Sequence, residues 1–495
     1  MDRRGFFQKS GGAAAVAAAG ATGMLASSPS VHAAVTSVLA ENAAGNAPGL
    51  IPRPLKLHVS RQGGSTTDEW ANYLVRHGVK HWLPSVPTSG GRNYWVPSDF
   101  GPVMDFAAKH GLTVECVTLP FLGSTHIDRE RNPAIMMADS PQRDRDIESI
   151  QLCISAMAAA GIPAFKYNMS LLGVLTSGRI PGRGNSTYRE FDASKLSDPG
   201  PTRAGIVTAD SFWERIDYFL QRVMPVCDQY KIRAACHPQD PGTPPGGYQG
   251  VLENVLSQPY GMGLFKFLSL YESPYHGLNL CCGTLAEALW DPDAEIYDIV
   301  RALARTKRVF NIHLRNIEGH RDNFREVWPD EGVINYPKLI QVLAEEGFEY
   351  GIDPDHMPSS PDDSGNRQGF AQGFGYIEGV IKAVDTFSPP YPVKPTASLQ
   401  VVPNVLNLRT PVGTVNTVLT VAGNADLRTW GISQVNANGV KALSYAVSGD
   451  GKSVVATFRK ADIASTATGN QFNIVGSLRG AKGTLVASAT VTALR

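Results

Sequence analysis

The sequence lacks any excess of charge of one sign. Its 45 Lys and Arg residues balance its 45 Asp and Glu residues, so the formal net charge at pH 7 is zero. No field of the whole protein therefore attracts nucleic acid or an acidic membrane surface, and we expect neither as a partner. A small ligand, neutral or locally charged, suits this composition better.

Cysteine is scarce, and long apolar runs are missing after the N-terminus. None of the cysteines shows a Cys-x-x-Cys spacing, and four lie in predicted strands or helices, where a buried thiol acts as a small hydrophobe. We therefore expect no disulfide framework and no transmembrane helix in the mature chain. The six cysteines are Cys116, Cys153, Cys227, Cys236, Cys281 and Cys282.

The first 34 residues differ from the rest of the chain. Arg3 and Arg4 precede a modest Ala- and Gly-rich apolar run, and small residues stand before Ala34. This pattern predicts a twin-arginine signal peptide over residues 1–34, with export to the periplasm or the extracellular space. The alternative is a chance pair of arginines before an Ala-rich helix. Residues 35–54 have no period and are expected to form a linker.

Residues 55–388 alternate between short apolar runs and segments of helical period. Eight such runs predict an α/β fold of the (β/α)₈ TIM-barrel type, and the Gly-rich first turn of a doubly wound sheet is missing. Ser211 with Glu214 reads as a capping box, and Asn335, Pro337 and Gly347 bracket another helix. The predicted strands are 55–60, 79–86, 112–119, 164–170, 232–237, 278–282, 309–314 and 349–354.

Two regions interrupt this alternation. Residues 171–207 form a long Gly-, Pro- and Arg-rich connection, which is either a lid, whose Arg179, Arg183 and Arg189 could meet an anionic substrate, or a disordered insertion. Residues 395–495 are rich in Val, Thr, Ala, Asn and Gly, in alternating runs. They predict a separate all-β domain, an immunoglobulin-like sandwich.

Metal-ligating residue types stand at the ends of four consecutive predicted strands. His237, Cys281 and His313 each end a strand, and the last strand leads into Asp355 and His356. Because the carboxyl ends of barrel strands meet at one mouth, we expect these side chains to converge there. Two imidazoles, a thiolate and a carboxylate suit Mn, Zn, Co or Fe. Strand alternation leaves Cys282 as the alternative to Cys281.

Five segments of the chain are similar to motifs of the mannonate dehydratase family, and the likeness extends over roughly residues 140–385. One segment matches the family's fourth strand. The other four match the family's His-Pro-Asp-Asp-Pro, Cys-x-Gly-Ser, His-Leu-Arg-Asn and Pro-Asp-His motifs. The segments are residues 161–168, 236–241, 278–284, 312–316 and 354–356.

The resemblance implies a xylose-isomerase-like barrel that dehydrates D-mannonate to 2-keto-3-deoxygluconate. It implies a divalent metal, Mn²⁺ first and Fe²⁺, Co²⁺ or Zn²⁺ otherwise, at the positions of His237, Cys281, His313 and Asp355. His356 then matches a catalytic acid/base, because dehydration needs proton transfer as well as a metal that holds an enolate.

Substrate contacts are also expected from the matching motifs. Arg315 could hold the carboxylate of a sugar acid in a bidentate pair, or it could form an ion pair within the barrel wall. Asn316 and Asn168 lie in the matching segments and are expected to contact the substrate.

The chain also departs from the family pattern. Residues 58–61 replace an aromatic motif of the first strand, and a catalytic Tyr of the family either falls at Phe370 or needs a gap in the match. Two alternatives therefore stay open: a sugar isomerase or epimerase of the same barrel class, and a secreted, non-catalytic carbohydrate-binding protein. A homo-oligomer is compatible with each of them.

Overall fold

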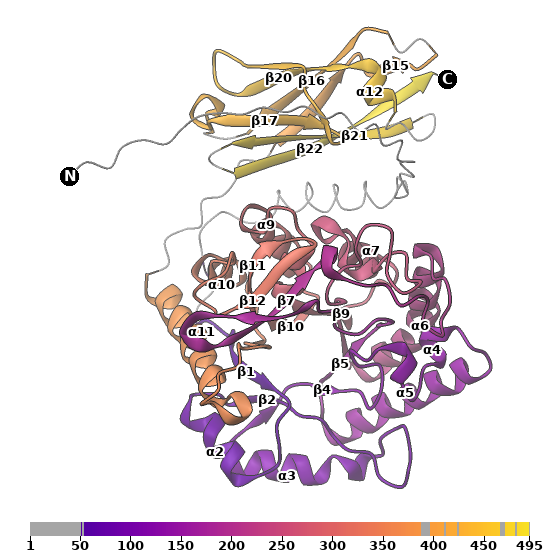
Figure 1. Ribbon diagram of the computed structural model, residues 1–495, viewed down its shortest axis with the longest axis vertical. Coiled ribbons are helices and arrows are strands. Elements are labelled where there is room, and N and C mark those ends of the chain that lie inside the picture. The colour runs from indigo at the N-terminus through magenta and orange to yellow at the C-terminus, as the bar shows by residue number, and fades with distance from the viewer. Residues whose placement is uncertain are drawn as a thin grey trace.

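The computed structural model describes residues 51, 54–387, 397–409, 412–422, 425–465, 471–480 and 483–494 (Figure 1). The predicted signal peptide, residues 1–34, lies outside the described residues, as do most of the predicted linker and the junction between the two domains. No helix in the described ranges is both long enough and apolar enough to cross a membrane.

The large domain is built around a parallel β-barrel, as the alternating pattern predicts. The strand order is β3-β2-β1-β13-β10-β9-β8-β5-β4. The two ends of this sheet, β3 and β4, both come from the predicted strand 112–119, which is interrupted at Glu115 and Cys116. The first half, β3, pairs with β2, and the second half, β4, pairs with β5, so the ring closes. The strands are β1 (His58–Gln62), β2 (His81–Leu83), β3 (Thr113–Val114), β4 (Val117–Thr118), β5 (Ala164–Asn168), β8 (Arg233–His237), β9 (His276–Cys281), β10 (Val309–His313) and β13 (Gly351–Asp353).

Helices surround this barrel and bury its outer apolar face (Figure 1). The Asn335 side chain caps α10 by accepting a hydrogen bond from Lys338 N, as predicted. The predicted cap at Ser211 is wrong, because α6 begins earlier and the Thr208 side chain accepts from Ser211 N. The helices are α2 (Asp68–Arg76), α3 (Gly101–His110), α4 (Ala134–Met137), α5 (Gln142–Ala160), α6 (Ala209–Tyr230), α7 (Met262–Ser269), α8 (Cys282–Glu287), α9 (Pro292–Arg305), α10 (Tyr336–Glu345) and α11 (Arg367–Phe387).

Strand alternation decides which side chains enter the barrel. In β5, Phe165 and Tyr167 belong to the apolar core, and the Tyr167 ring lies 5.3 Å from that of Phe219 on α6. Lys166 and Asn168 therefore point the other way, into the barrel. The same alternation turns His237, which is paired with Asn168, inward at the end of β8.

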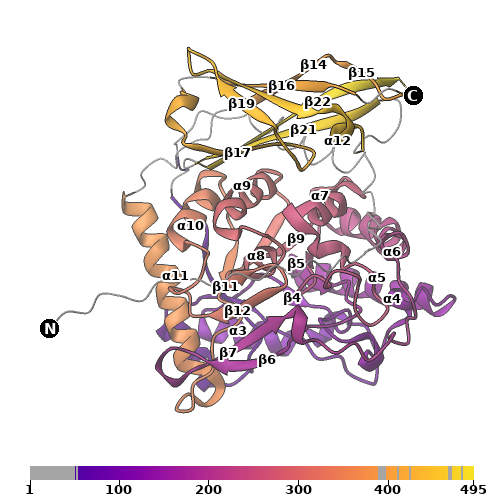
Figure 2. The ribbon, with the colours of Figure 1, turned by 45° about the horizontal axis from the view of Figure 1, so that its top comes forward.

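The long connection after β5 is ordered, so the alternative of a disordered insertion is wrong. It forms a hairpin of β6 (Gly178–Pro181) and β7 (Thr187–Asp192). This hairpin pairs with a second one, β11 (Asn316–His320) and β12 (Asn323–Val327), which we did not predict. Together they form a four-stranded sheet of order β11-β12-β7-β6, here called the hairpin sheet (Figure 2).

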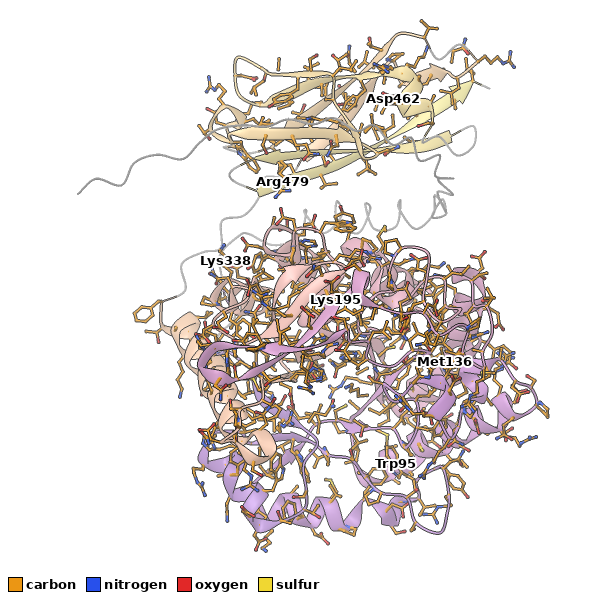
Figure 3. All side chains as sticks on the ribbon, in the orientation of Figure 1. Trp95, Met136, Lys195, Lys338, Asp462 and Arg479 are labelled. Atoms are coloured by element: carbon orange, nitrogen blue, oxygen red, sulfur yellow. The ribbon has the colours of Figure 1, made fainter. Side chains whose placement is uncertain are left out.

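The C-terminal residues form two β-sheets around a second apolar core, as predicted for a sandwich (Figure 2). Arg479 of this domain, labelled in Figure 3, forms an ion pair with Asp291, which precedes α9. One sheet has the order β14-β16-β20-β19 and the other β15-β22-β21-β17-β18. Their elements are β14 (Ala397–Val402), β15 (Val405–Asn407), β16 (Thr414–Val421), β17 (Ile432–Ala437), β18 (Val440–Lys441), β19 (Ser444–Val447), β20 (Ser453–Arg459), α12 (Lys460–Ala464), β21 (Gln471–Gly480) and β22 (Gly483–Leu494).

Candidate metal centre and active site

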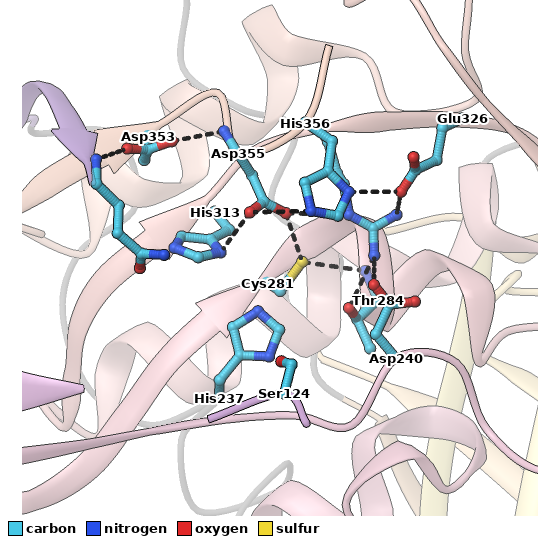
Figure 4. Close-up of polar contacts among 12 residues, drawn as sticks. Ser124, His237, Asp240, Cys281, Thr284, His313, Glu326, Asp353, Asp355 and His356 are labelled. Atoms are coloured by element: carbon cyan, nitrogen blue, oxygen red, sulfur yellow. Dashed lines mark hydrogen bonds and ion pairs between the residues drawn. The ribbon is translucent and has the colours of Figure 1, made fainter. Parts of the chain in front are cut away.

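The four predicted metal ligands lie together at the C-terminal end of the barrel (Figure 4). One ligand atom each from His237, Cys281 and His313 lies within 4.8 Å of the others. Asp355, just after β13, places Oδ1 2.9 Å from His313 Nδ1 and Oδ2 3.7 Å from Cys281 Sγ. Four strands that are distant in sequence thus deliver two imidazoles, a thiol and a carboxylate to one point.

The structure distinguishes the two adjacent cysteines. Cys281 ends β9 and faces the cluster, where its Sγ accepts a hydrogen bond from Thr284 N. Cys282 begins α8 and packs into the apolar core outside the barrel. Cys281 is therefore the thiol at the site, which agrees with the preferred prediction.

The donor set fits a divalent metal. His237 Nδ1 lies 2.5 Å from the Pro238 carbonyl oxygen, so this nitrogen donates and Nε2 keeps its lone pair, an arrangement common in metal-binding histidines. His313 Nε2 is buried and has no hydrogen-bond partner among the described residues. Burial and the nearby Lys166 lower the pKa of His237 well below its ordinary value, which favours the neutral ligand form.

The other two candidate ligands differ in their protonation. Burial would raise the pKa of Asp355, but His313 and His356 hold it well below its ordinary value, so this carboxylate is ionised. Burial raises the pKa of the Cys281 thiol to about 12. A cation that binds here would therefore displace a proton from Cys281, and its affinity would increase with pH.

His356, the predicted acid/base, lies at the edge of this cluster. Its side chain is 42% exposed, Nδ1 lies 2.9 Å from Glu326 Oε1, and Nε2 lies 3.8 Å from Asp355 Oδ1. Burial lowers the pKa of His356, but the carboxylates of Asp355 and Glu326 outweigh it and raise the pKa above its ordinary value. Glu326 was missed by sequence reasoning because it comes from the unpredicted β12.

Arg315 forms ion pairs within the barrel wall, one of the two interpretations left open by the sequence. All three of its side-chain nitrogens contact carboxylates, and the residue is 2% exposed. Its donors are therefore already engaged, and a bidentate contact with a substrate carboxylate has no free pair of N–H groups. The partners are Asp240 (2.7 Å), Glu326 (2.9 Å), Asp355 (3.1 Å) and Glu287.

Arg189 adds a second cation to these carboxylates. It projects from β7, and its Nη2 lies 2.8 Å from Glu326 and 3.2 Å from Asp240. Of the three arginines predicted to meet an anion, this one reaches the site, whereas Arg183 pairs with Asp330 and Arg179 is exposed. The hairpin sheet is therefore attached to the barrel mouth through Arg189.

The two predicted asparagine contacts have different surroundings. Asn316 Nδ2 donates to the carbonyls of Pro329 and Ile334, and Oδ1 accepts from two backbone N–H groups, so this side chain supports a loop instead of facing the cluster. Asn168 ends β5 beside His237 and donates to Ser124 Oγ at 3.0 Å. Asn168 thus stays the better placed of the two for a substrate.

Two further side chains near the cluster were not predicted. Lys166 is buried inside the barrel, where its charge interacts with Asp355 and Cys281, and burial lowers its pKa. Arg61 lies 3.3 Å from Asp353 Oδ1 and stacks 3.8 Å above the ring of Phe370. Phe370, one of the two placements that the resemblance leaves open for the family's Tyr, thus presents an apolar ring to Arg61.

Comparisons with known proteins agree with this geometry. The D-mannonate dehydratase (UxuA) family matches residues 202–389. A mannonate dehydratase of Streptococcus uberis is 31% identical over 277 residues, 49% of this chain and 77% of that protein. One from Geobacillus thermodenitrificans is 29% identical over 252 residues, 44% of this chain and 66% of that protein. The crystal structure of mannonate dehydratase from Streptococcus suis serotype 2 shares the fold, with a TM-score of 0.58 and 20% identity over 69% of this chain and 97% of that chain.

Proposed function

The chain belongs to the mannonate dehydratase family of hydro-lyases, and we propose that it uses one divalent metal to remove water from D-mannonate, giving 2-keto-3-deoxygluconate. The observation that carries this proposal is the convergence of His237, Cys281, His313 and Asp355 beside the acid/base candidate His356.

The four converging residues would hold the metal. A bound divalent cation such as Mn²⁺, or otherwise Fe²⁺, Co²⁺ or Zn²⁺, would supply positive charge that stabilises an enolate formed from the sugar acid. Asp355 is held in place for this role, because Arg315 Nε lies 3.1 Å from its Oδ2 and its own backbone N–H donates to Asp353 Oδ1 at 2.6 Å.

His356 would move the proton. Glu326 engages Nδ1, which leaves Nε2 on the side of Asp355, where a substrate can reach it. A protonated imidazole at this position can assist the departing hydroxyl group, and the neutral ring can accept the proton beside the carboxylate. Glu326 is in turn held by Arg189 and Arg315, so the ring position depends on the hairpin sheet.

Asn168 would contact the substrate from the opposite side of the mouth. Its amide nitrogen donates to Ser124, which orients its carbonyl oxygen. Arg315 would act indirectly, by holding Asp355 and Glu326, since carboxylates already occupy its donors.

Product analysis tests the proposal directly. The metal-loaded full chain is incubated with D-mannonate and with a series of other aldonic and uronic acids, and the products are followed by NMR. Formation of the 2-keto-3-deoxy acid, and its loss after chelation, supports the proposal. A shifted hydroxyl or carbonyl without loss of water would support an isomerase or epimerase, and no conversion of any acid would refute an enzymatic role.

A further inference from the structure

A second group of ligand-type side chains lies at the opposite end of the barrel. His58 and His81 are the first residues of β1 and β2, whereas His237, Cys281 and His313 are the last residues of their strands. Since all barrel strands run parallel, first and last residues lie at opposite ends. Glu115, in the break between β3 and β4, joins the two histidines.

Both imidazoles aim at one carboxylate oxygen. His58 Nε2 and His81 Nδ1 each lie 2.8 Å from Glu115 Oε1, and the two rings stack with centroids 3.6 Å apart. The His81 contact has no hydrogen-bond geometry, and its Nδ1 is buried without such a partner among the described residues. A hydrogen bond to Glu115 therefore accounts for one of the two nitrogens at most.

The contacts of His58 fix which of its ring nitrogens faces Glu115. Its Nδ1 lies 2.6 Å from the Lys56 carbonyl oxygen and must donate to it. A ring protonated at both nitrogens donates Nε2–H to Glu115, whereas the neutral ring presents the Nε2 lone pair on that side, where a divalent cation can take the place of the proton. Metal-binding histidines are commonly oriented by such a carbonyl.

An unpartnered polar atom and access from solvent are also present at this end. Gly351 lets Ser60 and Glu115 approach this point closely, because a Cβ there would lie 2.5 Å from Ser60 Oγ and 3.0 Å from Glu115 Oε2. Ser60 Oγ is fully buried without a hydrogen-bond partner among the described residues. The side chains of His58, His81 and Glu115 are 22%, 29% and 19% exposed, so a hydrated ion can enter from solvent.

We propose that His58, His81 and Glu115 form a second divalent-cation site, at the N-terminal end of the barrel. Two imidazoles and one carboxylate suit Zn²⁺ or a similar borderline cation, with water completing the shell. The site would join β1, β2 and the break in the third strand. It is independent of the proposed dehydratase site, and His58 lies in a segment that departs from the family pattern.

Cobalt separates the two sites because only one of them contains sulfur. The full chain, stripped by chelation, is titrated with Co²⁺, and bound cobalt is counted by dialysis with elemental analysis. A near-ultraviolet thiolate-to-cobalt band reports Cys281. We expect two cobalt ions per chain. One binds at Cys281 and develops this band; the other binds at His58, His81 and Glu115 without a band and is here called the sulfur-free cobalt equivalent. Cys281→Ser should abolish the band and keep the sulfur-free cobalt equivalent.

Glu115→Gln is the decisive variant, and exposed His320 provides the control. Glu115→Gln should lower the affinity for the sulfur-free cobalt equivalent. The loss should exceed the factor of about 10 to 100 by which metal affinity falls when a residue that only supports a ligand is removed. The thiolate band should stay unchanged. His81→Asn should do the same, and His320→Gln should change neither.

A direct measurement does not depend on any variant folding. Crystals of the unmodified chain soaked in Zn²⁺ should show anomalous density between His58, His81 and Glu115. The proposal would be overturned if the sulfur-free cobalt equivalent still bound after both Glu115→Gln and His81→Asn. It would also be overturned if the unmodified chain bound no such equivalent and its crystals showed no anomalous density between His58, His81 and Glu115. Neither outcome uses the thiolate band, which reports only the proposed dehydratase site. A failure of the second-site proposal can therefore be distinguished from a failure of the dehydratase proposal.

Discussion

Replacing Glu287 with Gln tests the charges beneath the hairpin sheet. Glu287 is fully buried beside Asp240, and two cations, Arg189 and Arg315, face the carboxyl groups of four residues there. Burial raises the pKa of Glu287 well above its ordinary value. Arg189 and Arg315, with a hydrogen bond from Glu287, lower the pKa of Asp240 to about 2 although burial opposes them. Glu287 therefore keeps its proton when the chain is folded.

The sign of the pH effect follows from this proton. In the unfolded chain Glu287 titrates near its ordinary value of 4.5, so above that pH the folded state binds more protons. The contribution of Glu287 to the free energy of unfolding then falls as pH rises, by about 1.4 kcal/mol per pH unit, until the folded group also ionises. Gln has nearly the same shape as a protonated Glu and does not titrate. The difference in free energy of unfolding between Glu287→Gln and the wild type should therefore grow in favour of the variant, by about 1.4 kcal/mol for each unit by which the pH rises.

Denaturant unfolding between about pH 5 and pH 7, followed by tryptophan fluorescence, measures this difference. All tryptophans except Trp430 lie in the barrel domain, so the signal reports mainly that domain. Glu346→Gln is the matched control: Arg305 and Arg301 lower the pKa of Glu346 against the effect of burial, so it is ionised in both states and its difference from wild type should stay flat. A flat or falling difference for Glu287→Gln would refute the assignment of the proton.

Three further predictions concern the metal, the second domain and export. His237→Ala should bind the metal of the proposed dehydratase site far more weakly, whereas His356→Ala should keep it and lose about 10²- to 10⁴-fold in turnover; equal metal contents with equal activities would contradict these roles. Truncation after Tyr391 should leave a folded, active barrel, because the candidate site residues all precede it, and circular dichroism with the dehydration assay decides this. Arg3→Lys with Arg4→Lys should leave precursor in the cytoplasm, as cell fractionation would reveal, and normal export would rule out the twin-arginine route.

The barrel was predictable because its signal is local and repeated. Each strand carries its own apolar run and each helix its own period, and these runs recur eight times along the chain. The break at Glu115 was not predictable, because an apolar run does not reveal that its two halves pair with different neighbours, β2 and β5. The hairpin of β11 and β12 was missed because residues 316–327 are mostly polar and charged, so no apolar run marks its two strands.

The sequence by itself determined which residue types end the barrel strands. Parallel strands end at one level, so the convergence of His237, Cys281 and His313 followed from their positions alone. Only the tertiary structure decided the partners of Arg315, the choice of Cys281 over Cys282, and the meeting of His58, His81 and Glu115. Those contacts join residues far apart in the chain, and they depend on which face of a strand a side chain occupies, which a run of apolar letters does not record.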